Sequence, residues 1–224
     1  ISNLDARYEY FFEGGQTVAL SGFYKYFQNP IELVAYSAAA PSNFQPRNVG
    51  NATVAGLEFE VRKNLGFMRL SNFEINSNFS YIYSAVTRDS TEYEARVVSA
   101  RIGEVIDKLR PMQGQSPYMV NIGLNYNNSK KGLQGGLFYN VQGEKLYIVG
   151  VADNPDVFEV PFHSLNFNLM QRFGKDRQYQ LGMGITNILD DTRDRIFVSY
   201  NSFSPYFSRW APRRTFKLTF RYSI

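Results

Sequence analysis

The chain has 224 residues, a formal net charge of +4, 19 Phe, 16 Tyr and no Cys. It contains no run of about 18 apolar residues, which excludes a transmembrane helix, and its basic residues are too dispersed for the clustered patch that nucleic-acid binding needs. The missing Cys fits a periplasmic or outer-membrane protein, and the absence of a leader before Ile1 suggests a mature or cut chain.

The first two predicted strands, 5–12 and 17–28, alternate apolar and polar side chains. Successive side chains of a strand point to opposite faces, so each strand presents one apolar and one polar face. Between the strands, Gly14 and Gly15 allow the positive φ values of a tight hairpin turn. A longer connection then covers residues 29–50.

Strands 55–62 and 72–83 come next, joined by a short turn at 64–66. One face of the second strand is entirely polar, which requires a wet surface beside it. Its members are Asn72, Glu74, Asn76, Asn78 and Ser80. A long polar loop over 87–113 leads to strands 118–127 and 133–142, which a turn at 128–132 connects.

The following loop contains Asp153-Asn154-Pro155-Asp156, which is good turn chemistry. Strand 165–172 places Leu165, Phe167 and Leu169 on its apolar face, whereas the apolar residues upstream of His163 have the opposite parity. We therefore expect a β-bulge near His163.

Strand 179–186 follows a short turn, and a final loop over 190–208 leads to the last strand, 214–224. The apolar face of this last strand is formed by Phe216, Leu218, Phe220, Tyr222 and Ile224. Roughly ten-residue strands that are apolar on one face and polar on the other are the signature of a transmembrane β-barrel. The predicted fold class is therefore all-β, a transmembrane antiparallel β-barrel.

Short turns and long connections alternate strictly along the chain. Outer-membrane barrels have short periplasmic turns and long extracellular loops, so we expect outer-membrane lipid around the strands and a periplasmic C-terminus. Aromatic residues at strand ends agree with interfacial girdles. They include Tyr10, Phe12, Tyr126, Tyr179 and Tyr222.

The count of about nine strands is odd, whereas bacterial single-chain barrels have even numbers. An unpaired strand edge cannot face lipid, so we expect the missing strands to come from the N-terminal part of the same polypeptide. Several charges point into the lumen, as a ladder of salt bridges or as contacts to a plug or solute. They are Glu58, Glu60, Arg62, Glu74, Lys217 and Arg221.

Three segments together resemble a known family. Residues 182–190, G-M-G-I-T-N-I-L-D, resemble the penultimate-strand motif of TonB-dependent outer-membrane receptors, and 56–60, G-L-E-F-E, resemble their recurrent G-x-E-x-E strand. Residues 110–118 resemble a loop-to-strand junction of Bacteroidetes members. The resemblance implies that residues 1–224 are the C-terminal part of a barrel of about 22 strands. The terminal Ile224 departs from the Phe that ends many outer-membrane proteins.

The resemblance further implies active transport of a scarce solute, such as a siderophore, cobalamin, glycan or peptide. An N-terminal plug and the TonB complex would be partners, with no catalysis and no cofactor, in a Gram-negative bacterium. Two alternatives stay open: a passive porin-like channel, and a barrel that serves as a structural scaffold for surface lipoproteins or an outer-membrane assembly complex. A plug with a TonB box would favour transport over both.

Other residues suggest weaker hypotheses. His163-Ser164 could belong to a hydrolase, but a rim position for His163 is the simpler interpretation. Asp190, Asp191 and Asp194 could hold Ca²⁺, but solvated loop charge is favoured because Arg residues interleave. An aromatic-rich last loop could contact ligand or a partner. Its residues are Tyr200, Phe203, Tyr206, Phe207 and Trp210.

Overall fold

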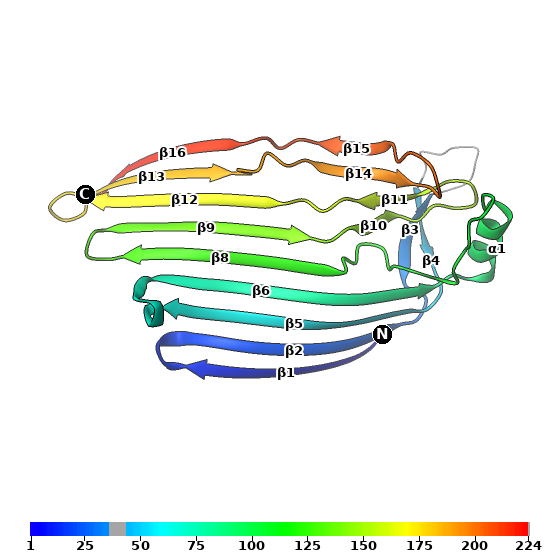
Figure 1. The fold of residues 1–224 in the computed structure, drawn as a ribbon, viewed down its shortest axis with the longest axis horizontal. Helices are drawn as coiled ribbons and strands as arrows, with labels where there is room; N and C mark the ends of the chain where they lie inside the picture. The colour runs from blue at the N-terminus through cyan, green and yellow to red at the C-terminus, as the bar shows by residue number, and fades with distance from the viewer. Residues whose placement is uncertain (36–43, 224) are drawn as a thin grey trace.

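The computed structural model describes residues 1–35 and 44–223, and Ile224 lies outside this range. Nine long antiparallel strands of a ten-stranded sheet form a surface here called the wall, in which each long strand pairs with the next long strand in chain order (Figure 1). The wall strands are β1 (Ser2–Phe12), β2 (Gln16–Phe27), β5 (Ala52–Leu65), β6 (Leu70–Thr87), β8 (Tyr118–Asn128), β9 (Leu133–Gln142), β12 (Ser164–Phe173), β13 (Tyr179–Thr186) and β16 (Thr215–Tyr222). The tenth strand, β7 (Leu109–Arg110), is short and pairs with the end of β6. All nine predicted strands are confirmed.

The wall separates apolar from polar side chains. In register, Leu20 of β2 lies opposite Phe59 of β5, and Phe59 lies opposite Phe79 of β6, so apolar side chains stay on one face across strands. These side chains are largely exposed, and Leu218 of β16 reaches 75% exposure. A broad exposed apolar surface of this kind requires an apolar environment such as lipid.

The short turns lie at one end of the wall and the long connections at the other (Figure 1). Aromatic rings pair near the short turns, with centroid distances of 4.9 Å for Phe73–Tyr126 and 5.5 Å for Phe173–Tyr179. Along β6, Phe73 and Tyr83 are separated by about 34 Å at the usual rise, or about 26 Å across a membrane at a strand tilt of about 40°. This spacing agrees with the apolar band of an outer-membrane barrel.

The long connections are more structured than the sequence predicted. The loops expected at 29–50, 87–113 and 190–208 instead contain regular elements, because tertiary contacts stabilise segments too short to show a clear period. They hold β3 (Ile31–Ala35), β4 (Phe44–Asn48), α1 (Ser90–Val98), β7 (Leu109–Arg110), β14 (Arg193–Val198) and part of β15 (Tyr206–Trp210). Strands β10 (Lys145–Ile148) and β11 (Asp156–Glu159) join β14 and β15 in a separate four-stranded sheet, here called the loop sheet.

The predicted β-bulge near His163 is wrong. β12 begins at Ser164 and pairs with β9 without a register shift, whereas β11 ends at Glu159 and belongs to the loop sheet. The shift of the apolar residues from one set of alternating positions to the other therefore occurs where the chain passes from one sheet to the next. Among residues 1–35 and 44–223, no helix is long and apolar enough to cross a membrane.

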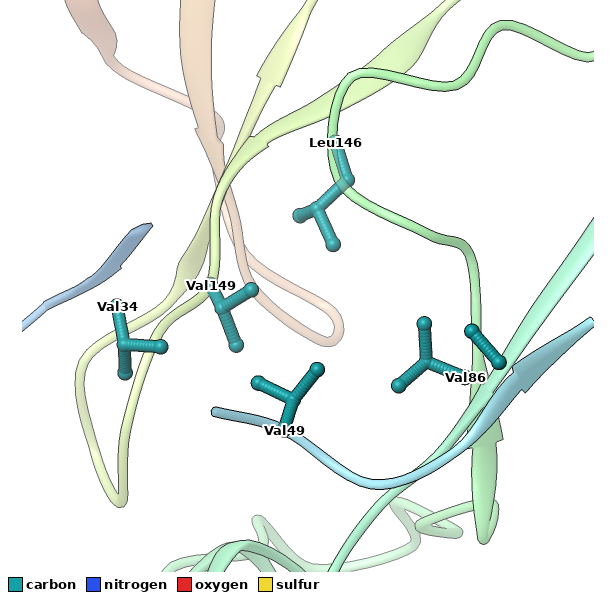
Figure 2. Packing of buried hydrophobic residues seen from close by; sticks show 6 residues of the cluster. Val34, Val49, Val86, Leu146 and Val149 are labelled. Carbon is teal, nitrogen blue, oxygen red and sulfur yellow. The ribbon is translucent and has the colours of Figure 1, made fainter. Parts of the chain in front are cut away.

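A buried core joins the long connections to the wall. Figure 2 shows Val34 of β3, Val49, Val86 of β6, Leu146 of β10 and Val149 converging from distant parts of the chain, and Val86 is fully buried. In the wall register, Val86 shares the face of the polar side chains. Segments of the connections, among them β3 and β10, therefore pack on the polar side at this end of the wall, while the loop sheet continues beyond the ends of the wall strands (Figure 1). We call the connections together the mouth layer.

Candidate functional site

The polar face of the wall carries the six charged side chains that the sequence assigned to the lumen. Lys217 in β16 lies opposite Gly184 in β13. From Gly184 the cross-strand partners can be followed through β12 and β9 to Asn125 in β8, which lies opposite Glu74 in β6, so these side chains share one face. The six are Glu58, Glu60, Arg62, Glu74, Lys217 and Arg221.

Part of this charge is paired within the wall. The guanidinium of Arg7 donates to both carboxylate oxygens of Glu60, at 2.8 and 3.0 Å, and Nε of Arg62 lies 3.5 Å from Oε1 of Glu74. Between the strands lies a cavity of about 300 Å³, lined by Thr17, Glu60, Val61, Arg62, Asn76, Ser77, Asn78 and Asn121. Within the described ranges, Glu58, Lys217 and Arg221 form no ion pair, so their charges can meet water or a partner.

Amide side chains extend the polar face across the middle of the wall. The amide of Asn140 in β9 donates to Asn121 in β8, and the amide of Asn121 donates to Asn78 in β6. Amides both donate and accept hydrogen bonds, so this row offers a polar solute several contacts without a net charge.

A buried ion network ties the mouth layer together. Nη1 of Arg110 lies 2.6 Å from Oε2 of Glu32, and Nε of Arg110 lies 2.7 Å from Oε1 of Glu92 in α1. The side chains of Arg110 and Glu32 are each only 2% exposed. Glu92 also pairs with Arg88 at 3.1 Å. The network therefore fixes β3, α1 and β7 against the end of β6.

Burial and ion pairing act in opposite directions on these arginines. Burial alone would lower the pKa of Arg110, but its hydrogen bonds to Glu92 and the charges of Glu92 and Glu32 raise that pKa above its ordinary value. Burial lowers the pKa of Arg88, although the charges of Glu92 and Asp156 oppose the shift. Both groups stay charged at any physiological pH, because an arginine pKa begins far above neutrality.

A cavity of about 360 Å³ opens beside this network, between the 104–111 segment and the loop sheet. Its charged lining combines three arginines, Arg88, Arg96 and Arg110, with Glu104, Asp107 and Asp156. Arg96 pairs with Asp156, whose carboxylate also accepts the backbone N–H of Gly150. Each of the three arginines is therefore already paired with a carboxylate of the chain, and the cavity lining carries no net charge.

The five aromatic residues of the last loop do not converge on one site. Tyr200 lines the 360 Å³ cavity, whereas Phe203 is 84% exposed. Phe207 packs on Phe44 and Phe197 at centroid distances of 5.9 and 5.4 Å, so it holds β4 against the loop sheet. Two arginines stack on the remaining rings, Arg209 over Tyr206 and Arg193 over Trp210. Tyr200 is thus the member best placed for ligand contact, which stays a prediction.

A second charged cluster lies in the loop sheet near the wall. Glu159 of β11 pairs with Lys145 of β10 at 3.1 Å and with Arg195 of β14 at 2.9 Å, and the Arg195 guanidinium stacks over Tyr147 at 3.6 Å. Burial would raise the pKa of Glu159, but hydrogen bonds from Arg195 and Lys145 outweigh burial and lower that pKa.

We expect Glu159→Gln to weaken the loop sheet by about 1.5–3 kcal/mol at pH 7, the range for hydrogen bonds to a charged group. Because folding lowers the pKa of Glu159, its contribution is complete above the unfolded value of about 4.3 and disappears as pH falls through the folded value. Hydrogen exchange of Lys145 to Ile148, compared between variant and wild type at the same pH, should differ at pH 7 and converge in strong acid. An equal difference at both pH values would contradict the assignment.

The side chains behind the hydrolase and Ca²⁺ hypotheses form local hydrogen bonds and ion pairs. His163 Nδ1 lies 2.7 Å from the hydroxyl of Tyr139, and the Ser164 hydroxyl accepts a hydrogen bond from Asn166. Asp191 accepts the backbone N–H of His163, and Asp194 pairs with Arg209 at 3.1 Å. Within the described part of the chain, no three His, Cys, Asp or Glu side chains gather in a way that could hold a metal ion.

The mouth-layer network was not predicted from the sequence, although one signal for it is present. Asp89 caps α1 by accepting the backbone N–H of Glu92 at 2.7 Å, and an acidic or hydroxyl residue followed three positions later by Glu predicts a helix start. Recognising this helix would have placed Glu92 and Arg96 on neighbouring turns of one helix face, with Arg88 directly before the N-cap. Nothing in the sequence points to Glu32, because its partners are far away along the chain.

The motif at 182–190 has a clear structural basis. Asn187 is buried with a left-handed φ of 52°, which Asn tolerates better than most residues. Its side-chain amide donates to the carbonyls of Asp191 and Arg213, and its backbone N–H donates to Asn166. One asparagine therefore joins β12, β13 and β16 at the end of the wall where the long connections lie.

Solved structures similar to this chain include a transporter and uptake receptors. The copper transporter OprC matches at a TM-score of 0.62 with 17% identity, over 99% of this chain and 31% of its own. The ferric yersiniabactin uptake receptor FyuA from Yersinia pestis matches at 0.66 with 16% identity, over 98% and 29%. The siderophore receptor PiuA from Acinetobacter baumannii matches at 0.64 with 14% identity, over 98% and 28%. At such identities these matches establish the fold alone.

This chain spans about a third of the length of those solved proteins. No curated protein sequence matches it. A family model described as "TonB dependent receptor-like, beta-barrel" matches residues 1–188, most of the chain. The chain therefore belongs to the TonB-dependent receptor-like β-barrel family.

Proposed function

We propose that residues 1–224 are the C-terminal part of the barrel of a TonB-dependent outer-membrane transporter. The observation that carries this proposal is the wall itself, with one continuous apolar face and one polar face. Within the described residues, β1 pairs only with β2 and β16 only with β13, so two edges need partners. Strands from the N-terminal part of the polypeptide would supply them and complete a barrel of about 22 strands.

In this proposal the polar face lines the lumen and contacts an N-terminal plug. The mouth layer captures a scarce solute outside the cell, and TonB pulls on the plug to open a path. The barrel performs no bond chemistry and needs no cofactor. The cavity beside Tyr200 carries arginines and carboxylates in equal number, so it offers a polar solute both hydrogen-bond donors and acceptors. The Bacteroidetes-type assignment rests on the 110–118 segment alone.

Uptake by the full-length receptor tests the proposal. Solute accumulation should require an intact TonB complex and should vanish when the TonB box of the parent polypeptide is deleted. Accumulation that persists without TonB would support a porin-like channel. A parent polypeptide with a plug but no TonB box, purified together with a surface lipoprotein, would instead support a scaffold.

The sidedness of the wall has its own test, since the chain has no native Cys. Ser90, at the start of α1, and Ser129, in the β8–β9 turn, are both exposed. In a Cys-free version of the receptor, an impermeant thiol reagent applied to intact cells should label Ser90→Cys and leave Ser129→Cys unlabelled. Labelling of Ser129→Cys alone would invert the proposed topology, and permeabilised cells, in which both should react, provide the control.

The need for partner strands is testable by refolding residues 1–224 alone in detergent. We expect aggregation or an open, protease-sensitive species, because both edge strands leave backbone groups without partners in an apolar environment. The full-length receptor serves as the control for refolding conditions. A monodisperse, heat-modifiable and protease-resistant monomer would contradict the proposal that this chain is part of a larger barrel.

A further inference from the structure

A groove of about 350 Å³ interrupts the apolar face near the short turns. It crosses β6, β8, β9 and β12, and its lining is almost wholly apolar: Phe73, Leu124, Tyr126, Gly135, Gly136, Leu137, Phe167 and Leu169. Gly135 lies between Tyr126 and Leu169 in the register and contributes no side chain to the apolar face, and the Leu169 side chain leans over it, since a Cβ atom there would lie 3.0 Å from Leu169 Cδ1.

Two basic turns flank the end of this groove. The β8–β9 turn carries Lys130 and Lys131, and the β12–β13 turn carries Lys175 and Arg177, with Asp176 as the only acid. Four positive charges against one negative charge leave a net charge of +3. The turns are neighbours, because a guanidinium nitrogen of Arg177 lies 3.4 Å from the Lys130 carbonyl oxygen. All five side chains are exposed.

The groove and the basic turns are connected through Tyr126. Its ring lines the groove, and its hydroxyl accepts a hydrogen bond from Asn128 at the beginning of the turn. Lys130 follows Tyr126 by four positions, which is at most about 14 Å along an extended chain. A molecule with an apolar tail and a negative head could therefore occupy both features at once.

We propose that this groove is a binding site for an anionic glycerophospholipid. One acyl chain would lie along the groove, and the phosphate would lie against the lysines and Arg177. Basic residues beside a membrane-embedded surface select anionic headgroups, whereas a zwitterionic lipid gains less from a net charge of +3. The inference rests on the proposed orientation of the apolar face toward lipid, and it adds a lipid class that the transport proposal does not require.

Native mass spectrometry of the intact receptor in a zwitterionic detergent tests this inference. We expect phosphatidylglycerol to bind at least fivefold more tightly than phosphatidylethanolamine. Lys130→Gln with Lys131→Gln should abolish the preference and leave phosphatidylethanolamine binding unchanged. Leu137→Trp, at a groove-lining position that is 41% exposed, places a larger side chain in the groove and should weaken binding of both lipids at least fivefold.

Two matched controls separate the site from general effects. Gly22→Leu lies on the apolar face of β2, where a Cβ atom has only an ordinary contact of 3.4 Å with Leu57, and it should leave lipid binding unchanged. Lys108→Gln removes a charge at the opposite end of the wall and should also have no effect.

Equal binding of the two phospholipids to the wild type would overturn the proposal. Loss of binding in Gly22→Leu to the same extent as in Leu137→Trp, or displacement of phosphatidylglycerol by lipopolysaccharide, would also overturn it. Failure of the transport proposal would instead appear as TonB-independent uptake, with the lipid preference intact.

Discussion

Arg110→Met is expected to destabilise the mouth layer by about 3–5 kcal/mol, the cost of removing one partner from a buried ion pair. Glu32 and Glu92 would lose their shared guanidinium partner, and the Glu32 side chain is only 2% exposed. Hydrogen exchange of α1 and β3 in the full-length receptor should accelerate by at least a hundredfold, while exchange in the wall strands stays slow. Limited proteolysis should cut first within 99–108.

Arg213→Met is the matched control for this substitution. Its side chain is 75% exposed and lies 3.9 Å from Asp190, and exposed pairs contribute about 0–1 kcal/mol. The triple variant Arg110→Met, Glu32→Gln and Glu92→Gln should recover part of the lost stability, since it removes the uncompensated charges. Equal effects of Arg110→Met and Arg213→Met would contradict the structural role given to the network.

Leu218→Arg is expected to destabilise the folded barrel by about 2–4 kcal/mol, the cost of an arginine on the lipid face near the bilayer midplane. Leu218 lies opposite Met183 of β13 and four residues from the girdle residue Tyr222, which is about 14 Å along the strand. Heat-modifiable migration and reversible unfolding of the full-length receptor in lipid vesicles should report this loss.

Lys217→Leu provides the comparison on the neighbouring position. Lys217 lies opposite Gly184 on the polar face and forms no ion pair within the described residues, so its replacement should cost under about 1 kcal/mol. If the two substitutions had equal effects, the assignment of apolar and polar faces in β16 would be wrong.

The wall could be predicted from the sequence because each long strand carries its own evidence. In β16, Phe216, Leu218 and Phe220 alternate with Lys217 and Thr219, and a polar lumen beside an apolar bilayer makes this alternation obligatory. The alternation of turn lengths was visible for the same reason, since each turn joins strands that are already evident.

The mouth layer could not be predicted in the same way. Its strands are short, and residues such as Glu32, which is polar and yet buried, break any simple pattern. Whether Glu32 is buried depends on Arg110, and no local rule connects two positions so far apart. The prediction of a bulge at His163 was wrong because it assumed that the residues before and after His163 belong to one strand of one sheet. The chain instead passes there from one sheet to another.

The two layers also differ in the sequence separation of their contacts, and this difference implies an order of assembly. Wall neighbours such as β8 and β9 are hairpins, whereas Gln113 bonds to Leu33 across 80 residues and its backbone N–H bonds to Glu32 across 81. Closing a long loop costs more chain entropy than closing a hairpin, so distant contacts form late unless other contacts bring them together. We expect the wall strands to pair first, one hairpin after another, during insertion into the membrane. The mouth layer should fold only afterwards, on the strands that have already paired.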